Sequence, residues 1–228
     1  MCIRDRKRRT RAIIAKEKGL EPLALYILQQ DTDKPVEEKA AEYISDEEGK
    51  EVASAADAIA GALDIIAEQI SDEADYRTYI RDITFKEGKI SSVAKDAEAE
   101  SVYETYYDYS ESLTTIPGHR VLALNRGENE KFLNVKIEAP VERILGYLEK
   151  KMIVSENQYT TPLLKAVVKD AYDRLIAPAI EREIRNSLTE TAEDGAIKVF
   201  GKNLEQLLLQ PPIAGKVCLL YTSDAADD

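Results

Sequence analysis

Apolar residues recur at steps of three and four along most of this chain, and that spacing restricts its fold more than any other feature. One such stripe lies in the first third of the sequence: Val52, Ala56, Ile59, Leu63, Ile66 and Ile70. Residues at this spacing share one face of an α-helix, while Asp57, Asp64 and Glu68 fall on the other face. The spacing therefore predicts an amphipathic helix here and a chain that is mainly α-helical.

The last third of the chain carries three more helical stripes. They are Leu164, Val168, Ala171 and Leu175; Ile180, Ile184 and Leu188; and Ile197, Phe200, Leu204 and Leu207. Pro178 lies between the first two stripes, and proline lacks the amide hydrogen that an inner helical turn needs. A break or sharp kink is therefore expected at Pro178, and Pro211 with Pro212 is expected to end the last helix.

Glycine and proline mark helix ends in the first part of the chain. A helix over residues 10–18 is expected to stop at Gly19. Pro22 suits the first turn of a second helix, which runs to about Gln30.

A further helix is expected over residues 73–86. Ser71 or Asp72 is placed to cap its start, and Gly88 is placed to end it.

The one good strand signal is the alternation of apolar and polar residues from Phe132 to Ile137. A strand needs a partner, and residues 90–93 offer the nearest one. The fold class expected from the whole sequence is therefore mainly α, a multi-helix assembly with at most a short β element near residues 132–138.

Four tyrosines at helical spacing lie upstream of this strand: Tyr103, Tyr106, Tyr107 and Tyr109. Packing into the protein core is the favoured interpretation of this group. Stacking on the bases of a nucleic acid is the alternative.

The two ends of the chain encode each other's complement. Met1 to Asp5 back-translates to a DNA sequence whose reverse complement, shifted by one base, encodes Cys218 to Ser223. This inverted repeat resembles the end of a transposase-type sequencing adapter, whose continuation encodes residues 224–228. We therefore expect residues 1–6 and 218–228 to be translated adapter, so that the natural segment spans about residues 7–217.

Removing these ends takes away both cysteines, Cys2 and Cys218, and with them thiol catalysis and thiolate metal sites. A segment without cysteine suits the cytoplasm, and no apolar run approaches the ~18 residues of a membrane span. The formal net charge changes from −12 to −10, because two arginines and four aspartates are lost. An acidic chain binds a polyanion only through a local basic patch.

Residue types needed for catalysis are scarce. The single histidine, His119, rules out a two-histidine metal site and leaves any catalytic triad dependent on one ring. Because it follows Pro117 and Gly118, a helix-start residue bonded to the backbone is the favoured interpretation. We expect no enzyme activity, no metal and no cofactor.

One dense basic run stands out in the acidic chain, and it consists of Lys7, Arg8, Arg9 and Arg11. Several such side chains together neutralise several phosphates, so this run is the candidate nucleic-acid contact. Ion pairing with acidic faces of the same protein is the alternative.

Four groups of short stretches share their order and separations with one protein family. They are Lys7–Arg11 with Gly19–Ala24; Tyr106–Tyr107 with Leu113–Arg120, Leu122–Ala123 and Arg126–Glu130; Arg174–Pro178 with Ile180–Glu183; and Ala196–Ile197, Val199–Phe200 and Asn203–Leu204 with Leu207–Pro212. Together they resemble the bacterial Tex family, the RNA-binding transcription accessory proteins, over residues 7–216. The chain departs from the family pattern at Arg6, where proline is usual, and at Gly118, where serine is common.

The resemblance implies a multidomain cytoplasmic protein that binds RNA or DNA, mainly through a C-terminal OB-type domain, and that works with the transcription machinery. In this interpretation residues 7–99 form an N-terminal helical region. Residues 100–217 form a middle helical region that leads toward an RNase-H-like domain.

Seven residues of the family motifs are expected to have structural roles: Pro117, His119, Arg120, Arg126, Gly127, Glu128 and Pro178. A buried network of arginines with Glu128 or Glu130 is expected around them. The function expected is that of a helical scaffold within a nucleic-acid-binding transcription accessory protein. A protein–protein interaction segment with no direct nucleic-acid contact is the alternative.

Overall fold

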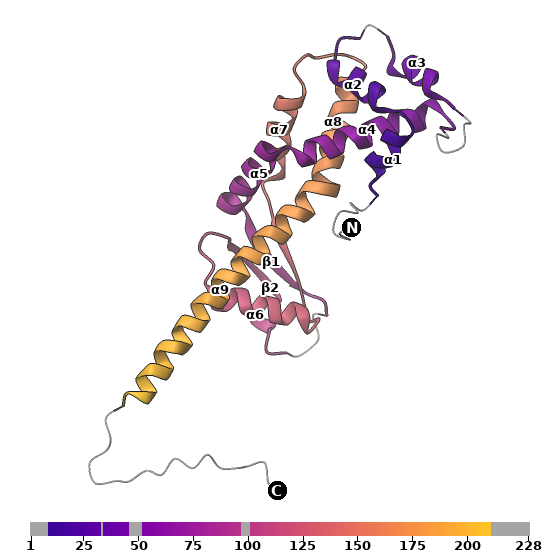
Figure 1. Ribbon diagram of the computed structural model, residues 1–228. Helices are drawn as coiled ribbons and strands as arrows, with labels where there is room; N and C mark the ends of the chain where they lie inside the picture. Colours follow the sequence, from indigo (N-terminus) through magenta and orange to yellow (C-terminus); the bar gives the residue numbers. More distant parts are fainter. Residues whose placement is uncertain (1–8, 33, 46–51, 97–100, 211–228) are drawn as a thin grey trace, which may run out of the picture.

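The computed structural model describes residues 9–32, 34–45, 52–96 and 101–210 (Figure 1). Both ends that we expect to be adapter, 1–6 and 218–228, lie outside these residues, as do Cys2 and Cys218. Helices dominate the described chain, and a small antiparallel sheet accompanies them. The prediction of a mainly α fold with a short β element is confirmed.

The first helices form a cluster at one end of the molecule (Figure 1). They are α1 (Arg11–Glu17), α2 (Glu21–Gln29), α3 (Val36–Ala40) with the short 3-10 helix η2 (Ala41–Tyr43), and α4 (Ala55–Asp72). Thr10 caps α1, since its hydroxyl oxygen accepts a hydrogen bond from the Ile13 amide at 3.2 Å. Gly19 ends α1 as predicted, with a left-handed φ of +79°. Pro22 lies in the first turn of α2, also as predicted.

Helix α4 is covered on more sides than its sequence stripe suggests. Its fully buried residues include Ala58, Ala62 and Ile65, whereas Ile59 and Leu63 are only partly buried. The reason is that α4 contacts α1, α2, α3 and α8. A helix between several neighbours buries small alanines as well as its large apolar residues.

Helix α5 (Ala74–Glu87) follows α4 almost directly and ends at Gly88 as predicted. The predicted cap at Ser71 or Asp72 is wrong, because both residues belong to the last turn of α4. Glu73 alone separates the two helices, in an extended conformation and without a side-chain cap. With one residue between helices, no room remains for a capping turn.

The sheet consists of β1 (Lys89–Ala94), β2 (Asp108–Ser112) and β3 (Leu133–Glu138), in the order β2-β1-β3. The predicted pairing of residues 90–93 with the 132–137 strand is confirmed, and Ile90 lies opposite Ile137. One face of the sheet buries Leu133 and Val135 on the side of α6 (Gly118–Asn129), and the other face exposes Val93. This alternation is typical of an antiparallel sheet with one solvated face.

Strand β2 differs from the prediction, because the spacing of the four tyrosines favours a helix over this segment. Only a short 3-10 helix, η3 (Glu104–Tyr106), forms there, and Tyr109 already belongs to β2. The predicted packing is nevertheless correct. Tyr103 is buried, and Tyr106, Tyr107 and Tyr109 pack against the core.

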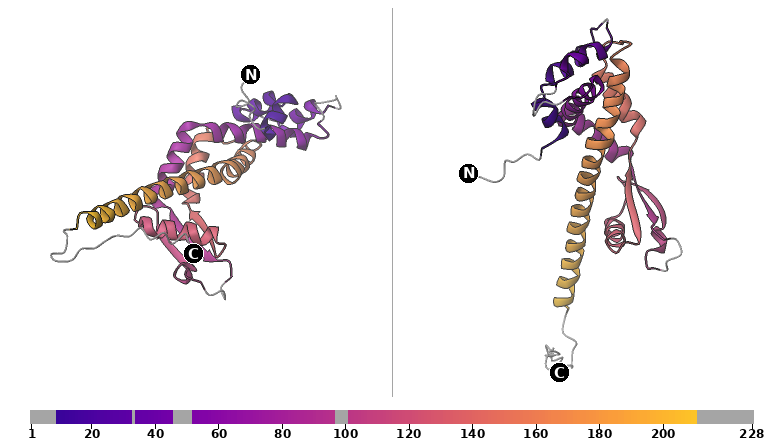
Figure 2. Two further views of the ribbon diagram at one scale, coloured as in Figure 1. Left: turned by 60° about the horizontal axis from the view of Figure 1, so that its bottom comes forward. Right: turned by 90° about the vertical axis from the view of Figure 1, so that its right-hand side faces the viewer.

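After α7 (Val141–Met152), the chain builds one continuous helical rod from α8 (Thr161–Asp170), the π-helix η4 (Ala171–Ile176) and α9 (Ala177–Leu208) (Figures 1 and 2). The predicted break at Pro178 is wrong. The wider turn of the π-helix precedes it, so Pro178 lies in the first turn of a new α-helical segment. Amides in a first turn need no partner within the helix.

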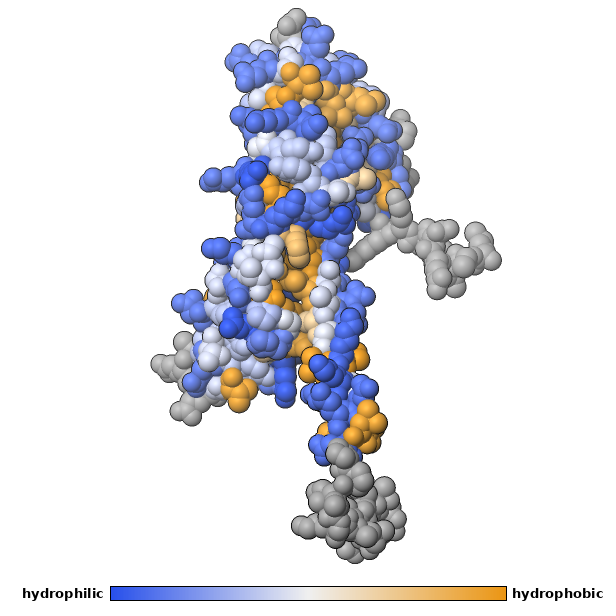
Figure 3. Space-filling view, turned by 90° about the vertical axis from the view of Figure 1, so that its left-hand side faces the viewer, coloured by the Kyte–Doolittle hydropathy of each residue, from blue (hydrophilic) through white to orange (hydrophobic). Residues whose placement is uncertain are grey.

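The rod connects the two ends of the molecule. Its α8 and η4 parts pack on α4, and its α9 part packs on α5 and α6. The last turns of α9 project beyond the body of the protein, where apolar side chains lie at the surface (Figure 3).

Strand β1 precedes the boundary expected between residues 99 and 100, and β2 and β3 follow it. That domain boundary stays a prediction.

Candidate functional site

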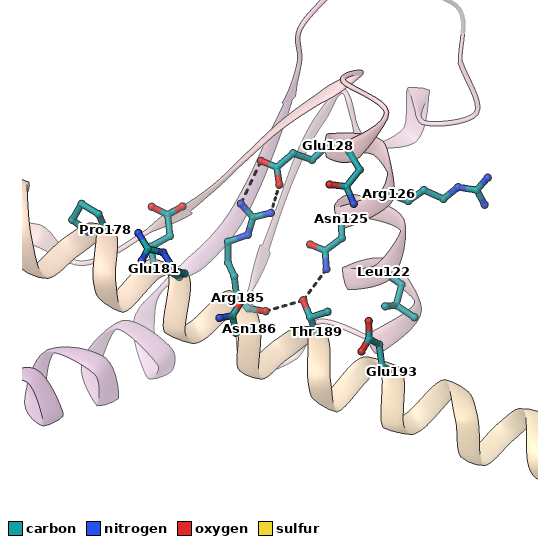
Figure 4. A pocket seen from close by; sticks show the side chains of 12 residues that line it. Leu122, Asn125, Arg126, Glu128, Pro178, Glu181, Arg185, Asn186, Thr189 and Glu193 are labelled. Atoms are coloured by element: carbon teal, nitrogen blue, oxygen red, sulfur yellow. Dashed lines mark hydrogen bonds and ion pairs between the residues drawn. The ribbon is translucent and has the colours of Figure 1, made fainter. Parts of the chain in front are cut away.

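A polar cleft separates α6 from α9, and it contains several of the family-motif residues (Figure 4). Its volume is about 680 Å³. The residues that line it are Leu122, Asn125, Arg126, Glu128, Asn129, Pro178, Glu181, Arg182, Arg185, Asn186, Thr189 and Glu193. The lining contains three arginines and three glutamates. The cleft is therefore not an electropositive site for phosphate.

The Arg185 guanidinium of α9 binds the Glu128 carboxylate of α6 with two nitrogens (Figure 4). The Nη1–Oε1 distance is 3.3 Å, and the second contact joins Nη2 to Oε2. Both side chains are partly buried, with exposed fractions of 22% and 31%. Arg185 Nη1 also lies 3.5 Å from the carbonyl oxygen of Val135 in β3. A two-point pair of this kind fixes orientation as well as distance, so it joins α9 to α6.

A short chain of hydrogen bonds continues this contact along α9. The Asn125 side-chain amide donates to the Thr189 hydroxyl oxygen at 2.8 Å, and that hydroxyl donates to the Arg185 carbonyl at 2.8 Å. On the other side of the pair, the Ile137 amide of β3 donates to Glu181 at 3.2 Å. Hydrogen bonds of Asn125, Glu128, Glu181, Arg185 and Thr189 thus connect three elements, α6, α9 and β3.

Arg126 in the last turn of α6 forms a separate ion pair at 2.9 Å with Glu130, the residue that directly follows the helix. The expectation of a buried network is wrong for this pair, since the Arg126 side chain is 75% exposed. Figure 4 shows Arg126 directed away from α9. The hydrogen bond from Arg126 lowers the pKa of the Glu130 carboxyl below its ordinary value.

Arg120 of α6 contacts β2, the strand that precedes this helix in the chain. Its guanidinium lies 3.0 Å from the Glu111 carboxylate and 3.2 Å from the Tyr109 hydroxyl. Hydrogen bonds from Tyr109 and from Arg120 hold the pKa of Glu111 below its ordinary value. The partner of Arg120 is thus Glu111, and neither Glu128 nor Glu130, which the sequence pattern suggested.

The remaining motif residues lie at the ends and at the packed face of α6. Pro117 precedes the helix in an extended conformation, and His119 is exposed in its first turn. The bond expected between the His119 ring and the backbone stays a prediction. Gly127 lies where an added Cβ would be 2.6 Å from Leu133 and 3.1 Å from Tyr103, so α6 and β3 approach closely there.

A double-mutant cycle tests the Arg185–Glu128 contact. We expect a coupling energy of about 1–2 kcal/mol between Arg185→Met and Glu128→Gln in urea unfolding, because the two groups are partly buried and share two contacts. The matched control is the cycle of Arg126→Met and Glu130→Gln, whose exposed pair should show a smaller coupling. Equal couplings in the two cycles would contradict a structural role for Arg185.

The candidate nucleic-acid run begins outside the described residues, where Lys7 and Arg8 lie. Arg9 forms an exposed ion pair with Glu17, and Arg11 is the exposed first residue of α1. For Arg9 the structure therefore shows the alternative that the sequence left open, pairing with an acidic side chain of the same protein. The role of the run in binding stays a prediction.

Among residues 9–32, 34–45, 52–96 and 101–210, no three His, Cys, Asp or Glu side chains are grouped so that they would hold a metal ion. No helix in these ranges is both long and apolar enough to cross a membrane. The absence of enzyme activity stays a prediction.

The sequence did not point to Arg185, Asn125 or Thr189. A usable signal is present in α9, where Glu181, Arg185, Thr189 and Glu193 follow one another at steps of four. Residues at that spacing form a single polar row on a helix. This row borders the apolar residues Ile180, Ile184 and Leu188 on the same helix, which indicates a polar contact with another element at the edge of the packed face.

The sequence matches the family described as Tex central region-like over residues 30–200. It is 50% identical to the protein named "Uncharacterized protein YdcI" of Bacillus subtilis, over 93% of this chain and 30% of the relative. It is 32% identical to the transcriptional accessory protein Tex of Neisseria gonorrhoeae, over 94% of this chain and 28% of the relative. It is 29% identical to the human S1 RNA-binding domain-containing protein 1, over 92% of this chain and 22% of the relative.

The chain thus spans less than a third of the length of these curated relatives. The family match covers α3 to most of α9, including the sheet, the cleft and the rod. On this evidence the chain belongs to the Tex family and corresponds to its central region.

Proposed function

We propose that this chain is the helical scaffold of a cytoplasmic, nucleic-acid-binding transcription accessory protein, with RNA as the nucleic acid. The observation that carries the scaffold role is the way in which the rod is joined to its neighbours. Arg174 of η4 binds Asp64 of α4 at 2.6 Å, and Glu183 of α9 binds Arg81 of α5 at 2.9 Å. Together with the pair of Arg185 and Glu128, these ion pairs join α4, α5 and α6 to the rod.

The names of two relatives support the nucleic-acid part of the proposal. One is named as a transcriptional accessory protein and another as containing an S1 RNA-binding domain. The relatives are more than three times as long as this chain. We infer that most of the affinity for RNA resides in polypeptide beyond this chain, and that Lys7, Arg8, Arg9 and Arg11 add a minor contact. No catalytic step is part of this proposal.

A second candidate function is a protein–protein interaction segment with no direct nucleic-acid contact, for example with the transcription machinery. The observation that favours it is the acidic surface, at a formal net charge of −12, together with exposed apolar residues at the end of α9. Acidic surfaces repel polyanions unless a basic patch overcomes the repulsion.

Binding of a single-stranded RNA to the chain across a salt series separates the two functions. We expect weak, salt-sensitive binding. The slope of log affinity against log salt should be no steeper than about −3, since each of the four basic residues can contact one phosphate and each contact contributes about −0.7. Replacing Lys7, Arg8, Arg9 and Arg11 by alanine should abolish this binding.

The matched control removes four exposed lysines from α7 and α8, which changes the net charge by the same amount: Lys150, Lys151, Lys165 and Lys169. This control should keep most of the affinity. No binding at the lowest salt, or equal losses in the two variants, would favour the protein–protein interaction segment.

A further inference from the structure

The end of α9 carries large apolar side chains that the described part of the protein does not cover. Their exposed fractions lie between 43% and 75%. They are Ile197, Val199, Phe200, Leu204, Leu207 and Leu208. Figure 3 shows apolar surface on this projecting end. Elsewhere exposed isoleucines and leucines such as Ile14, Leu25 and Ile44 are scattered singly, whereas a group of them on one element marks a contact surface.

These residues form one continuous face. At 3.6 residues per turn, positions 196, 197, 199, 200, 204, 207 and 208 fall within about half of the helix circumference. The opposite half carries Lys198, Lys202, Glu205 and Gln206. The projecting helix is therefore amphipathic, and its apolar half is exposed to solvent as well as its polar half.

The apolar face continues into a groove at its base. This groove has a volume of about 650 Å³ and lies between the start of α6 and α9. Ile116 and Leu122 line it on one side, and Leu188, Ala196 and Val199 line it on the other. Groove and helix face together form one apolar strip, which we call the α9 strip.

Polypeptide of the same protein is the occupant that best fits the α9 strip. The chain covers 30% of the B. subtilis relative and 28% of the N. gonorrhoeae relative, so a protein of family length contains more than twice as much additional polypeptide. A segment tethered to this chain meets the strip at a high effective concentration. A coiled coil with a second copy would use about two heptads, which is marginal for an independent helix pair.

We propose that the α9 strip is the docking surface for a further domain of the same polypeptide, which contacts it through an apolar surface of its own. This proposal rests on the proposed scaffold function and specifies how the scaffold joins its next domain. It requires that the strip be covered in a protein of family length and exposed in this chain alone.

The test compares the chain alone with a full-length chimera, in which the chain replaces the matched region of the B. subtilis relative. Hydrogen exchange of the amides in residues 196–208 is the measurement, and the amides of β1 report whether the fold is intact. We expect at least a tenfold slower exchange of residues 196–208 in the chimera than in the chain alone.

Paired substitutions on the two faces of α9 supply the matched comparison. In the chimera, Phe200→Asp with Leu204→Asp should remove the added protection, whereas Lys198→Asp with Lys202→Asp should retain it. Unchanged exchange between chain and chimera, or equal effects of the two pairs, would overturn the proposal. So would sedimentation of the chain alone as a dimer that Phe200→Asp dissociates, because the strip would then bind a second copy. The hydrogen-exchange comparison contains no nucleic acid, so its outcome does not depend on whether the chain binds RNA.

Discussion

Leu133→Ala is expected to lower the free energy of unfolding by about 2–5 kcal/mol, the range for deleting a fully buried leucine side chain. Leu133 has no exposed surface, and it begins β3 at the point where the strand meets α6. Gly127 lies directly against it, since a Cβ there would be 3.0 Å from the Leu133 Cγ. A glycine has no side chain with which to fill the space, so the cavity left by the substitution would persist.

Urea unfolding followed by circular dichroism measures this loss. The matched control is Val93→Ala in the neighbouring strand, whose side chain is 58% exposed on the other face of the sheet. That substitution should change stability by no more than about 0.5 kcal/mol. Comparable losses in the two variants would mean that α6 does not cover the sheet face that contains Leu133.

Gly88→Ala is expected to destabilise the protein by about 2–3 kcal/mol, because the added methyl group has no free space. Its Cβ would lie 2.3 Å from the Thr84 carbonyl oxygen and 3.0 Å from that of Glu138. Both are backbone atoms, so relief of the clash requires a shift of α5 or of β3. The backbone φ at this position is −75°, which alanine adopts freely, so steric contact is the only cause of the effect.

The control for Gly88 is Gly201→Ala, at a position in α9 where an added Cβ meets no atom within 4 Å. Alanine in an open helical position should leave stability unchanged or raise it by up to about 1 kcal/mol. Thermal unfolding of the two variants side by side gives the comparison. A Gly88→Ala protein as stable as the Gly201→Ala protein would show that α5 and β3 do not approach as closely as described.

The helices were predictable because their signal is local. The period of apolar residues and the stops at Gly19 and Gly88 depend on the chain within a few turns. Strand β3 was also predictable, since it alternates apolar and polar residues, whereas β1 (KISSVA) does not alternate and was predicted only as the nearest partner. Strand β2 was not predictable, because Asp108–Ser112 contains no aliphatic residue. Its contacts with α6 are polar and join Tyr109 and Glu111 to Arg120.

The polar contacts of the site depend on residues far apart in the sequence. Glu128 and Arg185 are 57 positions apart, and nothing near either residue identifies the other as its partner. The π-helix before Pro178 escaped prediction for a similar reason. Its wider turn occurs in a segment that packs on α4, so tertiary contacts as well as the proline determine it.

The continuous rod also limits how this region can change in length. Each residue inserted into an α-helix turns everything beyond it by about 100° and moves it by about 1.5 Å. An insertion between Arg174 and Arg185 would therefore rotate the contact with α6 away from the contact with α4, and the same rotation would carry the α9 strip to a new direction. Loops on either side of the rod tolerate extra residues. Within the rod, the number of residues fixes both the distance and the relative rotation between the contact with α4 and the contact with α6.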